Sequence, residues 1–257
     1  MDINLMVLNV GNSRLSAGVF EAGELRHIVR VPHQDRAQWP KIITETWAHL
    51  DGKPGASIAA ASVNPAVAEP LELVVTQVTG RKVAWVGREI ELPINVQTEN
   101  PAETGVDRVL NIAAAYEQLE KACVVVDAGT AVTVDFCNDN GDFLGGAIAP
   151  GVNLMLESLN TGTARLPRVT FDLPTGAVGK STVEAIRHGV YHGIRGMVKE
   201  LVENYATELG RWPEVIATGG DARALFDGWE LMHAIAPDLV FYGIALAYLE
   251  ADRRRGN

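Results

Sequence analysis

The sequence of 257 residues has few cysteines, no excess of basic charge and no long apolar run. Its two cysteines, Cys123 and Cys137, are too few for a metal-ligand set, and we expect reduced thiols that pack as small core side chains. The formal charge is −10, from 22 basic and 32 acidic residues. A nucleic-acid partner is therefore not expected, because a surface that binds nucleic acid needs a basic face.

Two further absences concern location. The first residues, MDINLMVLNVGNS, lack the basic segment that begins a secretory signal peptide. No apolar stretch is long enough to cross a bilayer. We therefore expect a cytoplasmic protein without a membrane partner. The hydrophobic content of 47% is ordinary for a globular protein and permits a substantial core.

Two familiar motifs are incomplete. Lys180, Ser181 and Thr182 resemble the end of a Walker A loop, but the first glycine of that motif is absent. His188 and His192 are four residues apart, as zinc ligands on a helix can be, but they do not form an HExxH motif. We interpret both features as incidental.

The densest functional signal is residues 124–136, VVVDAGTAVTVDF. A run of β-branched residues typical of a buried strand leads into a turn and then a second, alternating strand. In the turn, Gly129 lets backbone approach a ligand, the Thr130 hydroxyl can contact phosphate oxygens, and Asp127 can hold a cation or a water. The alternative is a tight hairpin in which the aspartate caps the turn.

The same pattern occurs near the N-terminus, at residues 8–20, so the sequence contains an internal repeat. Both copies indicate a strand, a glycine turn, a second strand and a hairpin that contains glycine. The aligned pairs are Asn9 with Asp127, Gly11 with Gly129, and Asn12 with Thr130. A repeat of this separation predicts two similar lobes that face each other.

A third signal is residues 100–108, NPAETGVDR, which lead into a helix. Asp107 at the helix start has two interpretations. It is either a first-turn acid that complements the helix dipole, with Arg108 a surface charge, or a carboxylate base beside a guanidinium that holds an anionic substrate. Spacing alone favours the first.

Other patterns predict elements around these signals. Residues 92–98 indicate a short strand, and residues 215–218 a strand that runs into a Gly-Gly turn. A long helix after Thr182 carries three glycines, for which close packing against another helix would compensate. Residues 240–250 indicate a helix that ends the fold, and we expect its Gly243 to pack near the Gly-Gly turn.

Taken together, these segments resemble the type III pantothenate kinase family, in the family's order and over nearly the whole chain. The shared segments are the first glycine hairpin, NPAETGVDR, VVDAGTAVTVDF, GGAIAPG, TARLPRV, VGKSTVEAIRHGVYHG, VIATGGDA and IAPDLVFYGIALAY. The family belongs to the actin, hsp70 and sugar-kinase superfamily. The resemblance therefore implies an α/β fold of ribonuclease H-like type, with two similar lobes of mixed sheet plus helices and a nucleotide cleft between them.

The implied lobes are residues 1–115, with the first phosphate hairpin and the substrate loop, and residues 116–257, with the second hairpin, a dimer helix and the Gly-Gly turn. The implied activity is ATP-dependent phosphorylation of pantothenate to 4′-phosphopantothenate, the first step of coenzyme A biosynthesis. The implied cofactors are ATP with Mg²⁺ and a monovalent cation, K⁺ or NH₄⁺. The implied assembly is a homodimer.

The resemblance also implies residue roles. Asp107 would be the base that takes the proton of the primary hydroxyl of pantothenate, and Asp127 would hold the monovalent cation. The substrate would be framed by Gly105, Val106, Arg108 and, across a dimer interface, Thr182. The ATP phosphates would be contacted by Asn9, Val10, Gly11, Asn12, Ser13, Arg14, Leu15, Ser16 and Thr130.

The chain departs from the family at the first hairpin. The family pattern is Asp-x-Gly-Asn-Thr, but here Asn9 replaces the aspartate and Ser13 the threonine. Thr98 stands where some members have a tyrosine near the substrate. An amide is a weaker ligand for a hard cation than a carboxylate. Two alternatives therefore stay open: a weakened or non-catalytic member that acts as a regulatory or accessory binding protein, and a kinase for a different small acid.

Overall fold

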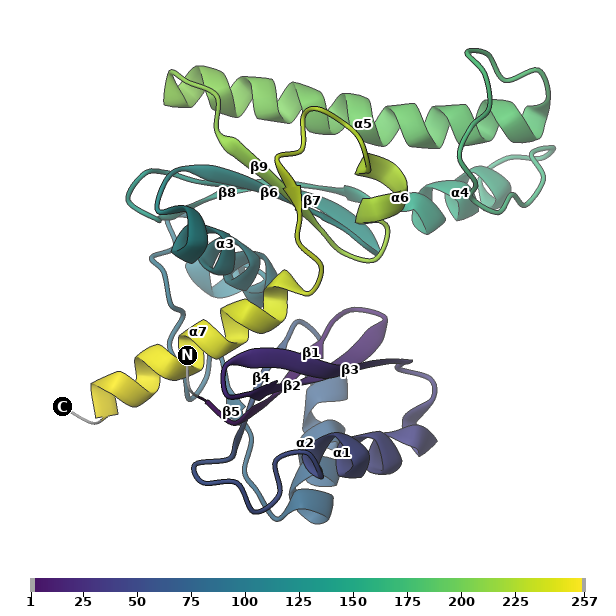
Figure 1. The fold of residues 1–257 in the computed structure, drawn as a ribbon. Helices are drawn as coiled ribbons and strands as arrows, with labels where there is room; N and C mark the ends of the chain where they lie inside the picture. Colours follow the sequence, from purple (N-terminus) through teal and green to yellow (C-terminus); the bar gives the residue numbers. More distant parts are fainter. Residues whose placement is uncertain (1–2, 256–257) are drawn as a thin grey trace. The chain divides into compact units, whose positions relative to one another are not determined.

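The computed structural model describes residues 3–255 as two compact units (Figure 1). The first unit comprises residues 3–95, 100–114 and 239–255 of the described chain, and the second comprises residues 96–99 and 115–238. Each unit contains a five-stranded mixed sheet with helices. This architecture confirms the predicted α/β fold with two similar lobes.

The first sheet has the strand order β3-β2-β1-β4-β5. Its strands are β1 (Leu5–Val10), β2 (Arg14–Glu21), β3 (Glu24–Pro32), β4 (Ser57–Ser62) and β5 (Ala84–Trp85). The central strand β1 pairs antiparallel with β2 and parallel with β4. The helical segments η1 (Arg36–Gln38) and α1 (Trp39–Trp47) connect β3 to β4, and α2 (Pro65–Thr79) connects β4 to β5.

Different helices cover the two faces of this sheet (Figure 1). Successive side chains of a strand point to opposite faces. The even-numbered residues of β1 pack with α1 and α2, whereas Leu5 and Val7 pack with Leu110 of α3 (Val106–Leu119) and with α7 (Leu239–Arg255). Asn9 continues the alternation of Leu5 and Val7, so its side chain lies on the α3 and α7 face.

The second sheet repeats this topology with the order β10-β9-β6-β7-β8. Its strands are β6 (Cys123–Ala128), β7 (Ala131–Cys137), β8 (Phe143–Pro150), β9 (Glu214–Thr218) and β10 (Ala234–Ile235). The central strand β6 pairs antiparallel with β7 and parallel with β9, as β1 does with β2 and β4. Asn9 and Asp127 each occupy the fifth position of a six-residue central strand, in agreement with the repeat seen in the sequence.

Helices α4 (Val152–Thr161), α5 (Thr182–Leu209) and α6 (Ala222–Phe226) belong to the second unit. The long helix α5 begins with a capping interaction, because the Ser181 side chain accepts a hydrogen bond of 3.2 Å from the backbone N–H of Glu184. Its buried stripe, at every fourth residue from Ile186 to Val202, packs on the sheet face opposite Asp127. It ends at Gly210, which has a left-handed backbone.

Two expectations from the sequence need correction. Residues 92–98 form no strand but a single bridge from Val96 to Phe143, because Pro93 cannot donate to a ladder. The closing helix α7 packs on the first sheet rather than in the second lobe. Gly243 of α7 lies against the backbone of Leu110 in α3, where a Cβ would come within 2.2 Å of the Leu110 carbonyl oxygen.

Within residues 3–255, no helix combines the length and the apolar character that a membrane span needs. The cysteines Cys123 and Cys137 are free and fully buried on neighbouring strands, as the sequence predicts.

Candidate active site

The turn between β1 and β2 exposes its backbone. Residues 12–14 are exposed, whereas Val10 and Leu15 are buried in the core as a cross-strand pair. The turn is closed by the Gly11 N–H, which donates to the Arg14 carbonyl at 3.1 Å. Of the predicted ATP contacts, Val10 and Leu15 can therefore contribute main-chain groups only.

Asn9 and Ser16 form the next cross-strand pair of the same hairpin, and both are half-buried. Their side chains lie on the face of the sheet that α3 and α7 cover, opposite to Val10 and Leu15. This end of the central strand thus presents an amide and a hydroxyl but no carboxylate.

Asp107 lies in the first turn of α3. Two residues separate this helix from the short helix η2 (Pro101–Glu103) that precedes it. The backbone N–H of Arg108 donates to the Asp107 carboxylate at 2.8 Å. A Cβ on Gly105 would lie 2.9 Å from the same carboxylate oxygen. Gly105 therefore leaves the space that this carboxylate occupies.

Burial raises the pKa of the Asp107 carboxyl, and the backbone N–H and positive charge of Arg108 oppose this rise only in part. The side chain keeps some exposure, so a ligand can reach it. A first-turn acid on a helix surface would not be desolvated in this way. The raised pKa is a property of functional carboxylates and supports the second interpretation of Asp107.

The second turn, between β6 and β7, contains Gly129 and Thr130, and Asp127 lies just before it in β6. Two other glycine segments pack against this turn. A Cβ on Gly151 would lie 2.1 Å from the Gly129 carbonyl oxygen. Gly219 has φ +94°, which residues with a Cβ rarely adopt. Backbone therefore packs directly on backbone around this turn.

Two oxygens lie close to Gly219. A Cβ there would lie 2.3 Å from the Ala128 carbonyl oxygen and 2.4 Å from an Asp127 carboxylate oxygen, so both oxygens pack against the Gly219 backbone. Hard cations prefer carbonyl and carboxylate oxygens. The residues present are consistent with the predicted cation role of Asp127.

A polar face that was not predicted from the sequence lies beside Asp127. Thr133 lies opposite Asp127 on β7, and Thr218 lies beside it on β9. Asp135 follows on this face, is only 1% exposed, and accepts a hydrogen bond of 2.8 Å from the Thr133 hydroxyl. The available signal was the alternation in VTVDF, which places both polar residues of β7 on one face.

Thr182, the remaining predicted substrate contact, is the exposed first residue of α5. The buried residues of α5 pack on the sheet face opposite Asp127. The predicted site residues thus form two sets: residues 9–16 and 105–108 in the first unit, and Asp127, Thr130 and Thr182 in the second.

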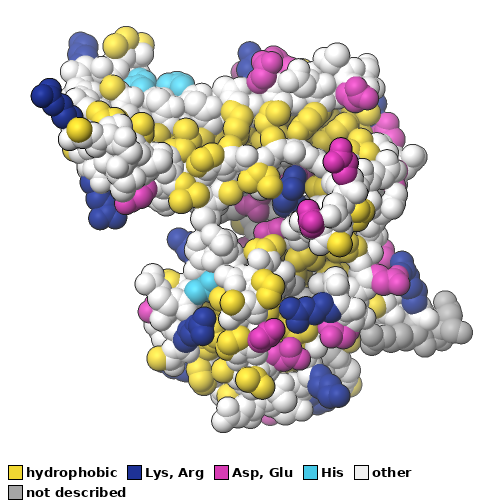
Figure 2. All heavy atoms as spheres, turned by 180° about the vertical axis from the view of Figure 1, so that it is seen from behind, with side chains coloured by type: hydrophobic (Ala, Val, Ile, Leu, Met, Phe, Trp, Pro, Cys, Tyr) yellow, Lys and Arg dark blue, Asp and Glu magenta, His cyan; other side chains and the backbone are white. Residues whose placement is uncertain are grey.

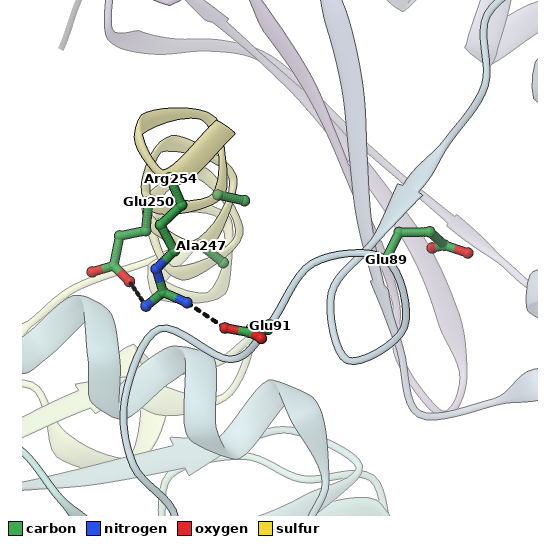
Figure 3. Close-up of a pocket in the computed structure, with 6 residues that line it drawn as sticks. Glu89, Glu91, Ala247, Glu250 and Arg254 are labelled. Atoms are coloured by element: carbon green, nitrogen blue, oxygen red, sulfur yellow. Dashed lines mark hydrogen bonds and ion pairs between the residues drawn. The ribbon is translucent and has the colours of Figure 1, made fainter. Parts of the chain in front are cut away.

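A separate hollow of about 220 Å³ in the first unit contains none of the predicted residues (Figure 3). Its lining is Glu89, Glu91, Ala247, Glu250, Ala251 and Arg254. Arg254 forms ion pairs with Glu91 and Glu250 across it. Three carboxylates against one guanidinium are unsuited to an anionic nucleotide.

Solved structures place this fold in a broad class. A Baf family transcriptional activator from Campylobacter jejuni aligns with a TM-score of 0.62 and 23% identity, over 96% of this chain and 99% of that chain. Component A of (R)-2-hydroxyglutaryl-CoA dehydratase from Acidaminococcus fermentans aligns with a TM-score of 0.55 and 15% identity, over 97% of this chain and 99% of that chain. MreB5 of Spiroplasma citri bound to ADP aligns with a TM-score of 0.53 and 12% identity, over 98% of each chain. The chain shares the two-lobed α/β fold of these proteins.

Sequence relatives define the family within this class. The sequence model of type III pantothenate kinase matches residues 5–204. A type III pantothenate kinase from Dehalococcoides mccartyi (strain CBDB1) is 32% identical over 249 residues, 95% of each chain. Another, from Anaeromyxobacter dehalogenans (strain 2CP-C), is 37% identical over 221 residues, 84% of this chain and 87% of that protein. The chain belongs to the type III pantothenate kinase family.

Proposed function

We propose that this protein transfers the γ-phosphoryl group of ATP to the primary hydroxyl of pantothenate, which forms 4′-phosphopantothenate in the first step of coenzyme A biosynthesis. Family membership over most of the chain supports the kinase over a non-catalytic accessory protein. The structural observation that carries the proposal is Asp107, a partly buried carboxylate beside Arg108 whose pKa burial raises. We place the reaction in the cytoplasm.

Asp107 is the group that takes the hydroxyl proton as the phosphoryl group leaves ATP. In phosphoryl transfer the protein mainly positions the reactants and neutralises charge, while a carboxylate orients the attacking hydroxyl. A raised pKa makes this carboxylate a stronger proton acceptor. Gly105 and Val106 border the substrate, and the Arg108 guanidinium pairs with the pantothenate carboxylate.

The two glycine turns contact the phosphates of ATP. Residues 9–16 would supply backbone N–H groups and hydroxyls, and Thr130 would supply another hydroxyl. The Mg²⁺ that accompanies ATP neutralises phosphate charge. Asp127 would hold K⁺ or NH₄⁺, because its carboxylate oxygens are the ligands that hard cations prefer.

Helix α5 supports a homodimer. Ala185, Gly189 and Gly196 are exposed along one side of it, and a Cβ on either glycine would meet no atom of this chain within 4 Å. Small side chains allow close approach of a second helix, which would offset the low helix propensity of glycine. In such a dimer, Thr182 would contact pantothenate bound to the partner subunit.

Product analysis tests the proposal. Protein, ATP, Mg²⁺, K⁺ and pantothenate are incubated, and the products are identified by mass spectrometry. We expect equal amounts of ADP and phosphopantothenate, and no phosphorylation of a pantothenate analogue without the primary hydroxyl. ADP release that is independent of pantothenate, or phosphorylation of another hydroxy acid instead, would contradict it.

The cation role of Asp127 is tested separately by changing the monovalent cation in the assay. Replacement of K⁺ by Na⁺ should lower turnover strongly, because the larger K⁺ and NH₄⁺ are the ions assigned to this position. Asp127→Asn should remove most of the difference between the two salts. Equal turnover of the wild type in both salts would refute the cation role and leave the kinase assignment intact.

A further inference from the structure

Three side chains that can bind metal converge at one edge of the first unit. Glu21 ends β2, His27 lies in β3, and His49 lies just after α1. One carboxylate oxygen and one nitrogen from each imidazole all lie within 4.8 Å of one another. The two imidazole rings are stacked, with centroids 3.5 Å apart and planes 9° from parallel. Histidine side chains reach the surface of both units (Figure 2).

A β-bulge sets the backbone at His27. Arg26 pairs with Val19 and Val29 pairs with Ala17, so β3 contains an extra residue at this point. His27 has φ +53°, in the left-handed region that residues other than glycine seldom adopt. Bulges redirect side chains and often lie beside functional sites. The bulge therefore accounts for the position of the His27 ring against His49.

Lys53 is the present partner of Glu21. Its ammonium nitrogen lies 3.1 Å from the carboxylate, and this hydrogen bond lowers the pKa of Glu21, with a smaller contribution from His27. The carboxylate is thus ionised at neutral pH and beside a positive charge. Lys53 lies in the same loop as His49 and is partly exposed, so its side chain can move away when another cation takes its place.

We propose that Glu21, His27 and His49 bind a divalent transition-metal ion, for which Zn²⁺ is the best chemical match. Two imidazoles and one carboxylate, with water as the fourth ligand, form a common tetrahedral zinc set. Bonds of about 2.1 Å place such ligands about 3.4 Å apart, so rotations of exposed side chains can close the set. The rings must tilt out of their stack for both lone pairs to point at the ion.

This site is distinct from the ATP site. Glu21 is at the opposite end of β2 from Arg14, roughly 23 Å away along an extended strand. Mg²⁺ prefers oxygen ligands, so the imidazoles select against the ion that accompanies ATP. The bound ion would join β2, β3 and the loop after α1, and we expect it to raise the melting temperature without being needed for phosphoryl transfer.

Isothermal titration of metal-free protein with ZnCl₂, without ATP, tests the proposal. We expect His27→Asn and His49→Gln each to weaken binding by about tenfold or more, since each removes a ligand. Asparagine is chosen at position 27 because it tolerates the left-handed backbone. Lys53→Gln should strengthen binding, because it removes a competing positive charge.

The pair His188 and His192 on α5 provides the matched control. These rings also stack, with centroids 5.5 Å apart, but the cluster of three ligands does not include them. The double variant His188→Gln, His192→Gln should bind zinc as the wild type does. Zinc binding that is lost in this control and kept in the His27 and His49 variants would overturn the proposal, as would a wild type that binds no zinc. Circular dichroism of the metal-free variants verifies that they are folded.

Discussion

Asn9 and Asp127 occupy equivalent positions in the two sheets but differ in charge. An asparagine offers one carbonyl acceptor, whereas an ionised aspartate offers two charged oxygens to a hard cation. Under the proposed function, the cation is therefore assigned to Asp127, and the first turn would bind phosphate through backbone N–H groups and hydroxyls. The family aspartate is missing where it would add charge near Mg²⁺ and ATP.

Restoring that carboxylate should change how the enzyme uses metal. We expect Asn9→Asp to lower the Mg²⁺ concentration needed for half-maximal turnover, because it adds a hard ligand beside the phosphates. Ser13→Thr, which restores the family residue without charge, is the matched control and should leave the Mg²⁺ dependence unchanged. Steady-state rates over a Mg²⁺ titration measure this. An unchanged or higher Mg²⁺ requirement in Asn9→Asp would show that position 9 does not contact the metal.

Asp107 should reduce stability at neutral pH. Burial raises its pKa in the folded protein, so the folded state binds the proton more tightly than the unfolded state, and ionisation destabilises the fold as pH rises through the folded pKa. Asp107→Asn should therefore melt at the same or a higher temperature than the wild type at pH 7. The difference should vanish below about pH 3.9, where the carboxyl is protonated in both states. A lower melting temperature for the variant at pH 7 would contradict the raised pKa.

The sequence predicts the place of Asp107 but not its burial. The glycine and proline around residues 101–105 mark the helix start, and the structure begins α3 at Val106. Burial depends on segments that are distant in the sequence, which spacing along the chain does not encode. The same holds for Asp135. The alternation of polar and apolar residues in VTVDF shows which face of the strand it lies on, but not that it is almost completely buried.

Among the elements, α3 and α7 are held together by a backbone contact. A Cβ on Gly243 would lie 2.2 Å from the Leu110 carbonyl oxygen. Leu110 is one helical turn after Asp107, so the position of the proposed base depends on this glycine. The sequence shows Gly243 inside a helix, but its partner is 133 residues away (243 minus 110) and only the fold shows it.

Gly243→Ala should reduce both stability and turnover. Overpacking typically costs about 1–3 kcal/mol, and here the clash is with backbone, which moves α3 as a whole. Ala251→Gly is the control: it weakens α7 by about 1 kcal/mol through helix propensity without pushing on α3. Thermal melts and kcat for both variants measure the effect. If kcat falls equally in both, the loss reflects general destabilisation and not the position of Asp107.

The strand expected over residues 92–98 shows a limit of pattern alone. Apolar residues there suggested a strand, yet Pro93 interrupts the pairing and only Val96 forms a bridge. Long elements with a regular period, such as α5, were predicted correctly because many residues support the same assignment.

At the level of the whole molecule, two sheets of identical topology account for the repeat in the sequence. The location of α7 did not follow from that repeat, because the last segment of the chain returns to the first unit. The proposed homodimer rests on the exposed glycines of α5 and on the exposed Thr182 at its first position.

Complementation tests the homodimer. If Thr182 serves the partner subunit, a mixed dimer of Asp107→Asn and Thr182→Ala subunits contains one complete site, with Asp107 from one subunit and Thr182 from the other. We expect co-expressed subunits to recover part of the activity that each variant lacks alone. The expected dimer mass is verified by light scattering. No recovery in verified mixed dimers would contradict the shared site.

The most direct test of the account is the rate of phosphopantothenate formation by the wild type and by Asp107→Asn at saturating ATP, Mg²⁺ and K⁺. Removal of a general base typically lowers the rate by about 10²–10⁴-fold. We predict a loss of this size in kcat with KM for pantothenate little changed, since the variant keeps the shape of the side chain and its hydrogen bond from Arg108. Turnover by Asp107→Asn at the wild-type rate would show that Asp107 is not the base and would contradict the account.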